Sequence, residues 1–267
     1  MHTLYELLSI ARFALPMPFQ SIEPRRLYRQ IADQIRTLIK TGEFPAGARL
    51  PPERDLAKQL GVSRPSVREA LIALEVEGLV EVRIGSGIYV QPGTEHASER
   101  KTHEAEAGPF ELLRARYMIE AECAALAAKS ARKGHLVAIA DALDEMQREM
   151  EAGEHHQLGG DRLFHLRIAE ATGNGALVAV VKMLWEERTG PLYKQLEHHY
   201  DSPALWEAAM TEHRAVLRAI AGKDATGARS AMQRHLNQAY KRFSIGWDAV
   251  DKSEGVRSLT AAHLGKI

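Results

Sequence analysis

Apolar side chains recur at helical spacing near the start of the chain. Leucine or isoleucine stands three or four residues apart at Leu27, Ile31, Ile35 and Leu38. This spacing places all four on one face of a helix. Gly42 follows, and glycine is common just beyond a helix end. The pattern therefore predicts an amphipathic helix that ends near residue 42.

Two closely spaced helices are predicted next. The first runs from Glu53 to Leu60, and Gly61 ends it. The second begins after Ser63, because serine is a favoured N-cap, and Ser66-Val67-Arg68-Glu69 adds a capping-box pattern near its start. A single tight turn joins the two helices, as in a helix-turn-helix.

A β-hairpin is predicted directly after the second helix. Residues 79–83 and 88–90 are rich in β-branched side chains and flank the turn sequence Gly85-Ser86-Gly87. Two helices followed by such a hairpin predict a winged helix-turn-helix, which places its second helix in the DNA major groove.

Six positions of this unit have the chemistry for DNA contacts. The arginines of the second helix have the reach for a bidentate contact with guanine, and the serine hydroxyls suit phosphate oxygens. A glycine in the wing allows close approach to a groove. The candidates are Arg54, Ser63, Arg64, Ser66, Arg68 and Gly85. Taken singly, each arginine is equally compatible with a solvated surface position, whereas the order of the elements favours DNA.

The rest of the chain is predicted to be helical throughout. A polar, charged segment comes first and has the composition of a linker. Helices are then predicted near 110–130, 133–152, 157–172, 175–199, 203–222 and 224–246, and Pro191 is expected to break or kink the fourth. The predicted organisation is an N-terminal extension (1–21), a winged helix-turn-helix domain (22–91), a linker (92–108), an all-α bundle of six to seven helices (109–247) and a C-terminal tail (248–267).

Composition narrows the class of protein. The 267 residues carry 35 basic and 35 acidic side chains, so DNA binding has to depend on local placement of arginines. The single cysteine, Cys123, excludes an internal disulfide and fits a reducing cytoplasm. No apolar run has the length of a membrane span, and the N-terminus lacks the basic start of a signal peptide.

Four side chains of the helical region are candidate metal ligands. Asp161 and His165 are four residues apart and share a helix face, while His213 and His235 stand on two other predicted helices with apolar flanks. One carboxylate and three imidazoles suit a divalent transition metal. From spacing alone, packed or solvated histidines are the more common alternative.

Residues 22–90 resemble the N-terminal domain of the GntR family of bacterial transcription regulators, through RRLYRQIADQIRTLIKTGEFPAGARLPPERDLA and GVSRPSVREALIALEVEGLVEVRIGSGIYV. The resemblance assigns DNA contact to the six candidate positions. Pro65 is a departure, because several relatives carry threonine there. Proline removes one hydroxyl contact but is compatible with a first helical turn.

Residues 110–243 resemble the FCD ligand domain of the FadR subfamily, through FELLRARYMIEAECAALAA, DRLFHLRIAEATGN, TEHRAVLRAI and AMQRHL. This resemblance implies that Asp161, His165, His213 and His235 hold zinc or nickel. It also implies that Arg116 reaches the same cavity to bind an effector carboxylate. A salt bridge between Arg116 and Glu120 is the alternative for that arginine. Asn174 is a second candidate for the cavity, with a helix cap as its alternative.

Further segments, EPRRLYRQ and KMLWEER among them, resemble the hexuronate-responsive regulators of the subfamily. The resulting expectation is a non-enzymatic, homodimeric repressor that binds a palindromic operator and responds to a small carboxylate, with a hexuronate as the first choice. Two alternatives remain at this stage. A metal-dependent hydrolase or isomerase lacks an identifiable general base, and a DNA-binding protein with a purely structural metal needs no effector.

Overall fold

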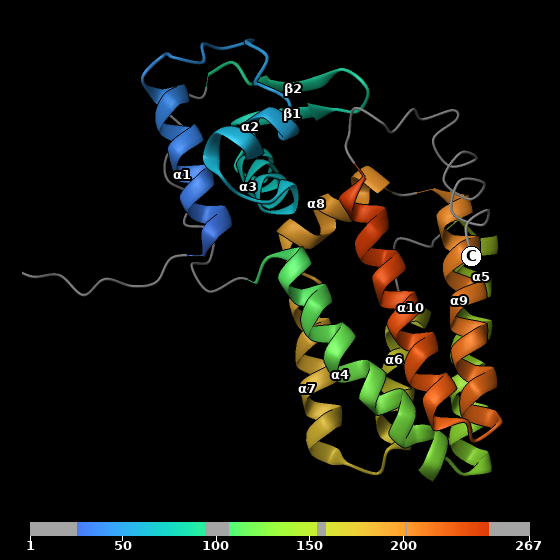
Figure 1. Ribbon diagram of the computed structural model, residues 1–267. Helices are drawn as coiled ribbons and strands as arrows, with labels where there is room; N and C mark the ends of the chain where they lie inside the picture. Colours follow the sequence, from blue (N-terminus) through green and yellow to red (C-terminus); the bar gives the residue numbers. More distant parts are fainter. Residues whose placement is uncertain (1–25, 94–106, 154–158, 201, 246–267) are drawn as a thin grey trace, which may run out of the picture.

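The computed structural model describes residues 26–93, 107–153, 159–200 and 202–245. In chain order, the elements are α1 (Leu27–Lys40), α2 (Glu53–Leu60), α3 (Arg64–Val76), β1 (Val80–Arg83), β2 (Gly87–Val90), α4 (Pro109–Ser130), α5 (Lys133–Glu151), α6 (Gly159–Ala171), α7 (Gly175–Glu187), α8 (Pro191–Tyr200), α9 (Pro203–Ala221) and α10 (Ala225–Ser244). The predicted extension, the predicted tail and most of the predicted linker lie outside the described residues. The fold class is the predicted one: a winged helix-turn-helix followed by a helical bundle (Figure 1).

Helix α1 buries a slightly different face from the predicted one. Of the four apolar side chains that define the predicted face, Leu27 and Leu38 are 48% and 39% exposed. Helix α1 packs on α3, and the side chains it buries there are Tyr28, Ile31, Ala32, Ile35 and Ile39. Tyr28 follows Leu27 by one residue, and Ile39 follows Leu38 by one residue. The buried face is therefore rotated slightly from the face that the four predicted positions define.

The turn between α2 and α3 is made as the sequence predicts. Gly61 ends α2 with a φ of +66°, a left-handed conformation that glycine adopts without strain. Ser63 is the N-cap of α3, and its hydroxyl accepts a hydrogen bond from the backbone N–H of Ser66 at 3.2 Å. Pro65 lies in the first turn of α3, where its missing N–H removes no helical hydrogen bond. Ser66 and Glu69 do not form the predicted capping box, because Glu69 bonds to α4 instead.

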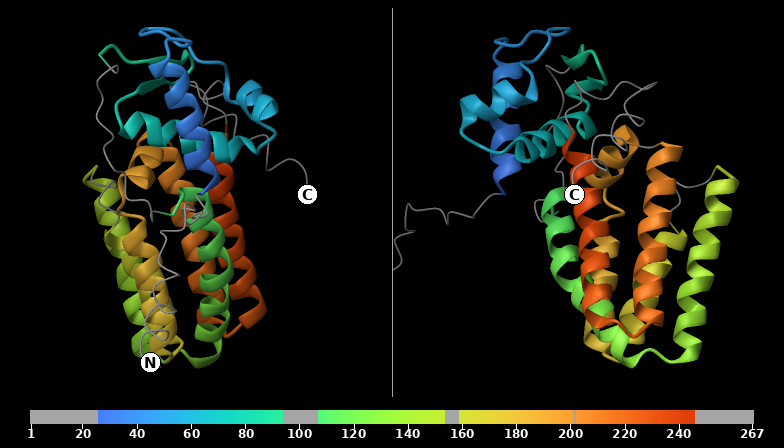
Figure 2. Two further views of the ribbon diagram at one scale, coloured as in Figure 1. Left: turned by 90° about the vertical axis from the view of Figure 1, so that its left-hand side faces the viewer. Right: turned by 45° about the vertical axis from the view of Figure 1, so that its right-hand side comes forward.

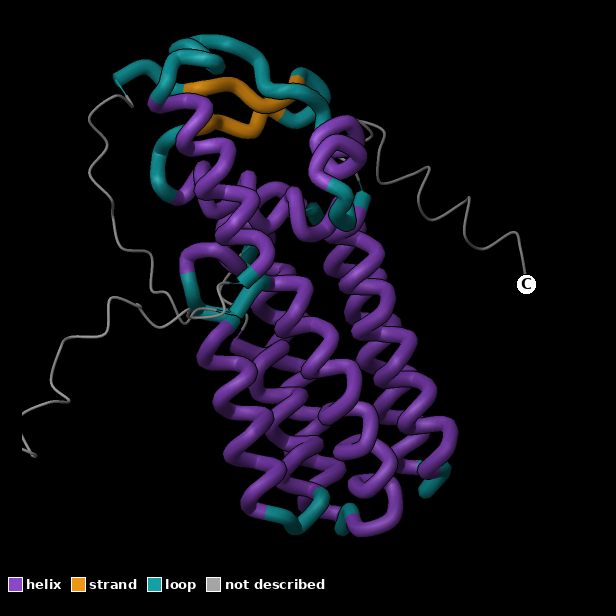
Figure 3. The backbone as a smooth tube through the Cα atoms, turned by 60° about the vertical axis from the view of Figure 1, so that its left-hand side comes forward, coloured by secondary structure: helices purple, strands orange, loops and turns teal. Residues whose placement is uncertain are grey.

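The wing is a two-stranded antiparallel sheet in which Val80 pairs with Val90 and Val82 with Ile88. These four side chains are buried, so the hairpin adds its apolar face to the core beneath it. Gly85 has a φ of +74° in the exposed turn between the strands. The sheet lies at the end of the molecule furthest from the helical bundle (Figure 3).

Helices α4 to α10 form the second domain, in which α10 lies against both α4 and α9, and α5 packs on α6 and α9 (Figure 2). The helix predicted at 175–199 is broken at Pro191, as expected, and forms α7 and α8. Proline cannot donate the backbone hydrogen bond that would continue α7. The break turns α8 toward the winged domain, while α7 stays in the bundle (Figure 1).

The two domains pack directly against each other. One apolar core fills the bundle, and the other fills the winged domain. The winged-domain core also contains four side chains from the second domain: Phe110 of α4, and Leu192, Leu196 and Tyr200 of α8. The recognition helix α3 is therefore packed against α8, and the two domains are in direct contact through this pair of helices.

Candidate metal centre and DNA-binding surface

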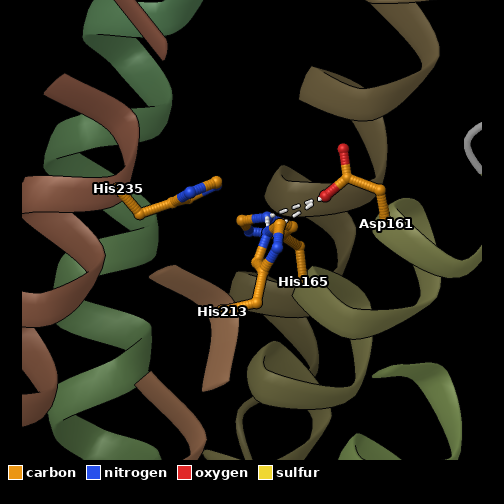
Figure 4. A group of neighbouring side chains, drawn as sticks. All are labelled: Asp161, His165, His213 and His235. Carbon is orange, nitrogen blue, oxygen red and sulfur yellow. Dashed lines mark hydrogen bonds and ion pairs between the residues drawn. The ribbon is translucent and has the colours of Figure 1, made fainter. Parts of the chain in front are cut away.

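The four predicted metal ligands come together inside the bundle. Asp161 and His165 lie one turn apart on α6, His213 comes from α9 and His235 from α10. One ligand atom from each lies within 4.8 Å of the others, and all four residues are buried. Their side chains converge from three helices (Figure 4).

The atoms that meet at the centre of this cluster are metal donors. Nε2 of His165 lies 3.3 Å from Nε2 of His213, and Oδ1 of Asp161 lies 3.4 and 3.2 Å from these two nitrogens. Oδ1 is buried and has no hydrogen bond within the described part of the chain. A buried carboxylate oxygen without a hydrogen bond is costly unless a cation satisfies it. The donor set fits a divalent transition ion.

The charge state of the cluster also suits a cation. Burial alone would raise the pKa of Asp161, but Arg188 and the adjacent imidazoles of His165 and His213 hold it well below its usual value. Burial lowers the pKa of His213, and burial together with the neighbouring imidazoles lowers that of His235 well below normal. An ionised carboxylate and neutral imidazoles are the forms that coordinate metals.

His165 differs from the other two histidines because a second carboxylate lies beside it. Burial lowers its pKa, but the carboxylates of Glu120, beside Nδ1, and of Asp161 together outweigh burial and raise it. Nδ1 of His235 similarly lies 2.9 Å from Oε2 of Glu212. Carboxylates on the outer nitrogen of a metal-binding histidine fix the ring and its tautomer. Sequence analysis considered Glu120 only as a partner of Arg116 and did not single out Glu212, because each stands on a different helix from its histidine.

Arg188 contacts Asp161 of this cluster from the other side. Its Nη1 donates to Oδ2 of Asp161 at 2.8 Å, and its Nε and Nη2 donate to Oε1 of Glu197 at 3.0 and 2.5 Å. Sequence analysis missed this residue too. It follows the last residue of α7, and only the break at Pro191 brings α8 and Glu197 back toward it.

A cavity of about 640 Å³ opens beside the cluster. Asp161, His213 and His235 lie in its wall, together with basic and aromatic side chains: Arg116, Arg162, Trp185, Arg188, Tyr193, Lys194, Trp206 and Arg242. The volume is typical of a small-molecule site, and mixed aromatic and basic walls suit a small anion. Arg116 pairs with Glu120 at 2.8 Å, but its Nη2 has no hydrogen bond in the described part of the chain. The pair is buried, unlike a helix-surface salt bridge.

Asn174 does not belong to this cavity, and its assignment as an effector contact was wrong. Its side chain is the N-cap of α7 and accepts from the backbone N–H groups of Ala176 and Leu177 at 3.0 and 3.4 Å. The residue is exposed, and it is absent from the cavity wall. The alternative considered for it, a helix cap, is the role it has.

Most of the predicted DNA-contacting side chains are accessible. Arg54 is 81% exposed at the start of α2, and Arg64 is exposed at the start of α3. Ser63 is exposed beside it and Ser66 is half-buried, with their hydroxyl oxygens 2.8 Å apart. Together with Gly85 of the wing, they lie on the domain that carries the recognition helix. Backbone and hydroxyl donors at such a helix start suit phosphate contacts.

Arg68 departs from the prediction, because its side chain is fully buried. Its Nε and Nη2 donate to the two carboxylate oxygens of Glu53 at 2.6 and 2.5 Å, and Nη1 donates to the backbone carbonyl of Phe243 in α10. Its guanidinium carbon also lies 6.0 Å from the ring centre of Tyr200. In this arrangement Arg68 joins the two domains and is not presented to a base edge.

Comparison with known proteins agrees with this arrangement. Residues 27–90 match the bacterial regulatory proteins of the gntR family, and residues 111–238 match the FCD domain. The chain therefore belongs to the GntR family and combines its winged helix-turn-helix with an FCD domain. Members of these families are transcription regulators, not enzymes.

Within that family, the chain is similar to regulators of two named systems. It is 40% identical over 224 residues to the Uxu operon transcriptional regulator of Escherichia coli K12, covering 82% of this chain and 87% of that one. It is 40% identical over 218 residues to the Exu regulon transcriptional regulator of the same strain, covering 80% and 83%. The Uxu operon regulator of Haemophilus influenzae is 36% identical over 225 residues, covering 82% and 83%. Among the described helices, none is both long and apolar enough to cross a membrane.

Proposed function

We propose that this protein is a repressor whose DNA binding is modulated by a small carboxylate bound in the cavity of the helical domain. The observation that carries the proposal is the position of the Asp161, His213 and His235 cluster in the wall of a cavity of about 640 Å³. A purely structural metal site has no need of such a cavity. The carboxylates beside the cluster are already paired, Glu120 and Glu212 with histidines and Glu197 with Arg188, which argues against a hydrolytic role that needs a general base.

The proposal includes a divalent transition metal, with zinc as the first choice and nickel as the second. Asp161, His165, His213 and His235 would hold it, and the buried Oδ1 of Asp161 supports the assignment. Three nitrogens and one oxygen are common donors for both ions. Once bound, the ion supplies open coordination positions that a carboxylate of the effector can occupy.

Hexuronates are the effector class that we favour. The cavity offers positive charge for a carboxylate through Arg116, whose Nη2 lacks a hydrogen bond in the described chain, and through Lys194. Trp206 and Tyr193 add aromatic surface, which suits the apolar faces of a sugar ring, while Glu197 and Arg162 offer partners for its hydroxyl groups. The similarity to the Uxu and Exu regulators supports the same class.

On the DNA side, we assign contacts to Arg54, Ser63, Arg64, Ser66 and Gly85. The exposed start of α3 and the exposed wing turn support these assignments. We further propose a homodimer on a palindromic operator, because one winged domain offers few phosphate contacts and two copies double them. Light scattering of the purified protein would measure the mass directly, and a monomer with and without DNA would exclude the dimer.

The test is thermal unfolding of the zinc-loaded protein with glucuronate, galacturonate, fructuronate and non-acidic hexoses. A ligand at about a hundred times its dissociation constant adds roughly 2.7 kcal/mol of stability. At about 2–4 °C per kcal/mol for a protein of this size, the melting temperature rises by roughly 5–11 °C. We expect such a shift with one hexuronate and none with the neutral sugar. The same compound should weaken binding to a duplex selected by the protein from a random-sequence library.

Two controls separate the parts of the proposal. Removing zinc with a chelator should abolish the shift if the ion takes part in binding. The variant Arg116→Gln should weaken the shift while zinc stoichiometry stays at wild-type level. A flat response to all acids would exclude hexuronates as the effector. A shift that persists in full after zinc removal would exclude the ion from the effector site.

A further inference from the structure

Helix α8 takes part in two different packed surfaces. Tyr193 belongs to the bundle core and to the cavity wall, and Glu197, one turn later, also lies in that wall. Leu192 and Leu196 are offset from these two by one residue and belong to the winged-domain core. An offset of one residue rotates a helical position by about 100°. One ten-residue helix therefore presents one face to the cavity and another to the recognition helix.

The cavity face of α8 is tied to the metal centre by charge. Glu197 accepts two hydrogen bonds from Arg188, and Arg188 donates a third to Asp161. These three side chains are each less than one-fifth exposed. An anion that enters the cavity meets the same guanidinium and competes with Glu197 for it. The position of α8 is therefore sensitive to what the cavity contains.

The other face of α8 is tied to the recognition helix. Nε2 of His199 lies 2.6 Å from Oε2 of Glu75 in α3, and Oε1 of Glu75 accepts from the backbone N–H of Val82 in the wing at 2.9 Å. The hydroxyl of Tyr200 donates to the backbone carbonyl of Ile245 at 2.6 Å. Two residues earlier, the backbone carbonyl of Phe243 accepts from Arg68 of α3. The end of α8 thus contacts the recognition helix directly at Glu75, and Glu75 in turn contacts the wing at Val82.

We propose that α8 transmits effector binding from the cavity to the recognition helix, through the Arg188–Glu197 pair at one face and the His199–Glu75 pair at the other. The inference rests on the proposed function, since it concerns regulation of the same site. Coupling requires that the ligand bind two arrangements of the protein unequally. A rigid helix that contacts both regions cannot change its position at the cavity without changing its contacts with α3.

The experiment measures this coupling without any effector. Glu197→Gln removes the charge that faces Arg188, and His199→Ala removes the contact with Glu75. Affinity for a duplex selected by the wild-type protein from a random-sequence library is measured for zinc-loaded wild type, both single variants and the double variant. We expect Glu197→Gln to change DNA affinity by about 5-fold or more, the low end of allosteric coupling. In the His199→Ala background, the same substitution should change it less than about 2-fold.

Gln195→Ala is the matched control, because Gln195 lies on α8 but not in the cavity wall or in either core. The effect of Glu197→Gln should persist in full in that background. Glu75→Gln provides a second way to weaken the contact with His199. Its amide oxygen can still accept the hydrogen bond from the backbone N–H of Val82. An equal effect of Glu197→Gln with and without the His199–Glu75 contact, or no effect in any background, would overturn the proposal. Loss of hexuronate binding alone would leave this result unchanged and count only against the proposed effector.

Discussion

Arg188 and Asp161 form a buried pair in which the guanidinium occupies only one oxygen of the carboxylate. Nη1 of Arg188 donates to Oδ2 at 2.8 Å, and Oδ1 is left facing His165 and His213 without a hydrogen bond in the described structure. The arginine keeps the aspartate ionised, because it lowers the pKa against the effect of burial. It also orients the free oxygen toward the imidazoles, so the pair prepares a ligand atom for a cation.

Arg188→Gln should therefore weaken zinc binding. The substitution removes the charge that lowers the pKa of Asp161 and shortens the side chain that orients its carboxylate. Loss of such a supporting contact costs about 10- to 100-fold in metal affinity. Competition with a chromophoric chelator measures the effect. Arg167→Gln, on the outer surface of α6 and paired with Glu170, should leave zinc affinity unchanged. Equal affinities in wild type and Arg188→Gln would contradict the role.

Glu212→Ala should also reduce zinc affinity, by about 10-fold or more. Oε2 of Glu212 lies 2.9 Å from Nδ1 of His235 and holds a proton on that nitrogen, which directs the lone pair of Nε2 toward the cluster. Glu212 also binds Arg242 at 2.8 and 3.1 Å, so Arg242→Gln tests whether the loss arises from the histidine contact or from the arginine. Glu207→Ala, exposed on the same helix, is the control. Zinc affinity in Glu212→Ala that matches this control would refute the prediction.

Glu69 should make stability depend on pH. Its carboxylate accepts from the backbone N–H of Phe110 at the start of α4, and burial raises its pKa from 4.5 to about 7. The folded state thus binds this proton more tightly than the unfolded state. The resulting stability is complete below pH 4.5 and is lost as the pH rises through about 7.

Glu69→Gln carries an uncharged amide at every pH and lacks this dependence. The melting temperature of Glu69→Gln relative to wild type should therefore increase between pH 5 and pH 8. Calorimetry at several pH values provides the measurement. Glu43→Gln, in an exposed loop of the same domain, should follow the wild-type profile. A constant difference between Glu69→Gln and wild type across this range would show that Glu69 does not titrate in the folded protein.

Arg64 and Arg68 should behave differently although they stand one turn apart on α3. Arg64→Ala should weaken DNA binding by about 1–3 kcal/mol and leave thermal stability unchanged, because the side chain is exposed. Arg68→Met should cost roughly 3–5 kcal/mol of folding stability, because it leaves the carboxylate of Glu53 buried and unpaired.

Chemical denaturation and fluorescence anisotropy measure the two quantities separately. The double variant Arg68→Met, Glu53→Leu removes both charges and should recover much of the stability lost in Arg68→Met alone. A normally stable Arg68→Met protein that fails to bind DNA would restore the original assignment of Arg68 to the DNA-contacting set.

Local patterns in the sequence were sufficient for the elements of this protein and for naming the four candidate metal ligands. Helix caps, glycine stops and apolar spacing depend on neighbouring residues only, so Ser63, Gly61 and Pro191 have their predicted effects. Asp161 and His165 share a helix face for the same reason. The sequence pattern also offered His213 and His235 on two other predicted helices, and the family resemblance favoured a metal for all four. The fold brings the four side chains together.

Tertiary packing alone decided what surrounds those residues. Glu120, Glu212 and Arg188 acquire their roles because α4, α9 and the end of α7 approach the cluster, and no spacing along the chain encodes that approach. Arg68 looks like a base-reading arginine in sequence, yet Glu53 and the end of α10 enclose it. The spacing of residues along a helix defines its faces, but the burial and charge partner of each side chain depend on which distant segment packs against that face.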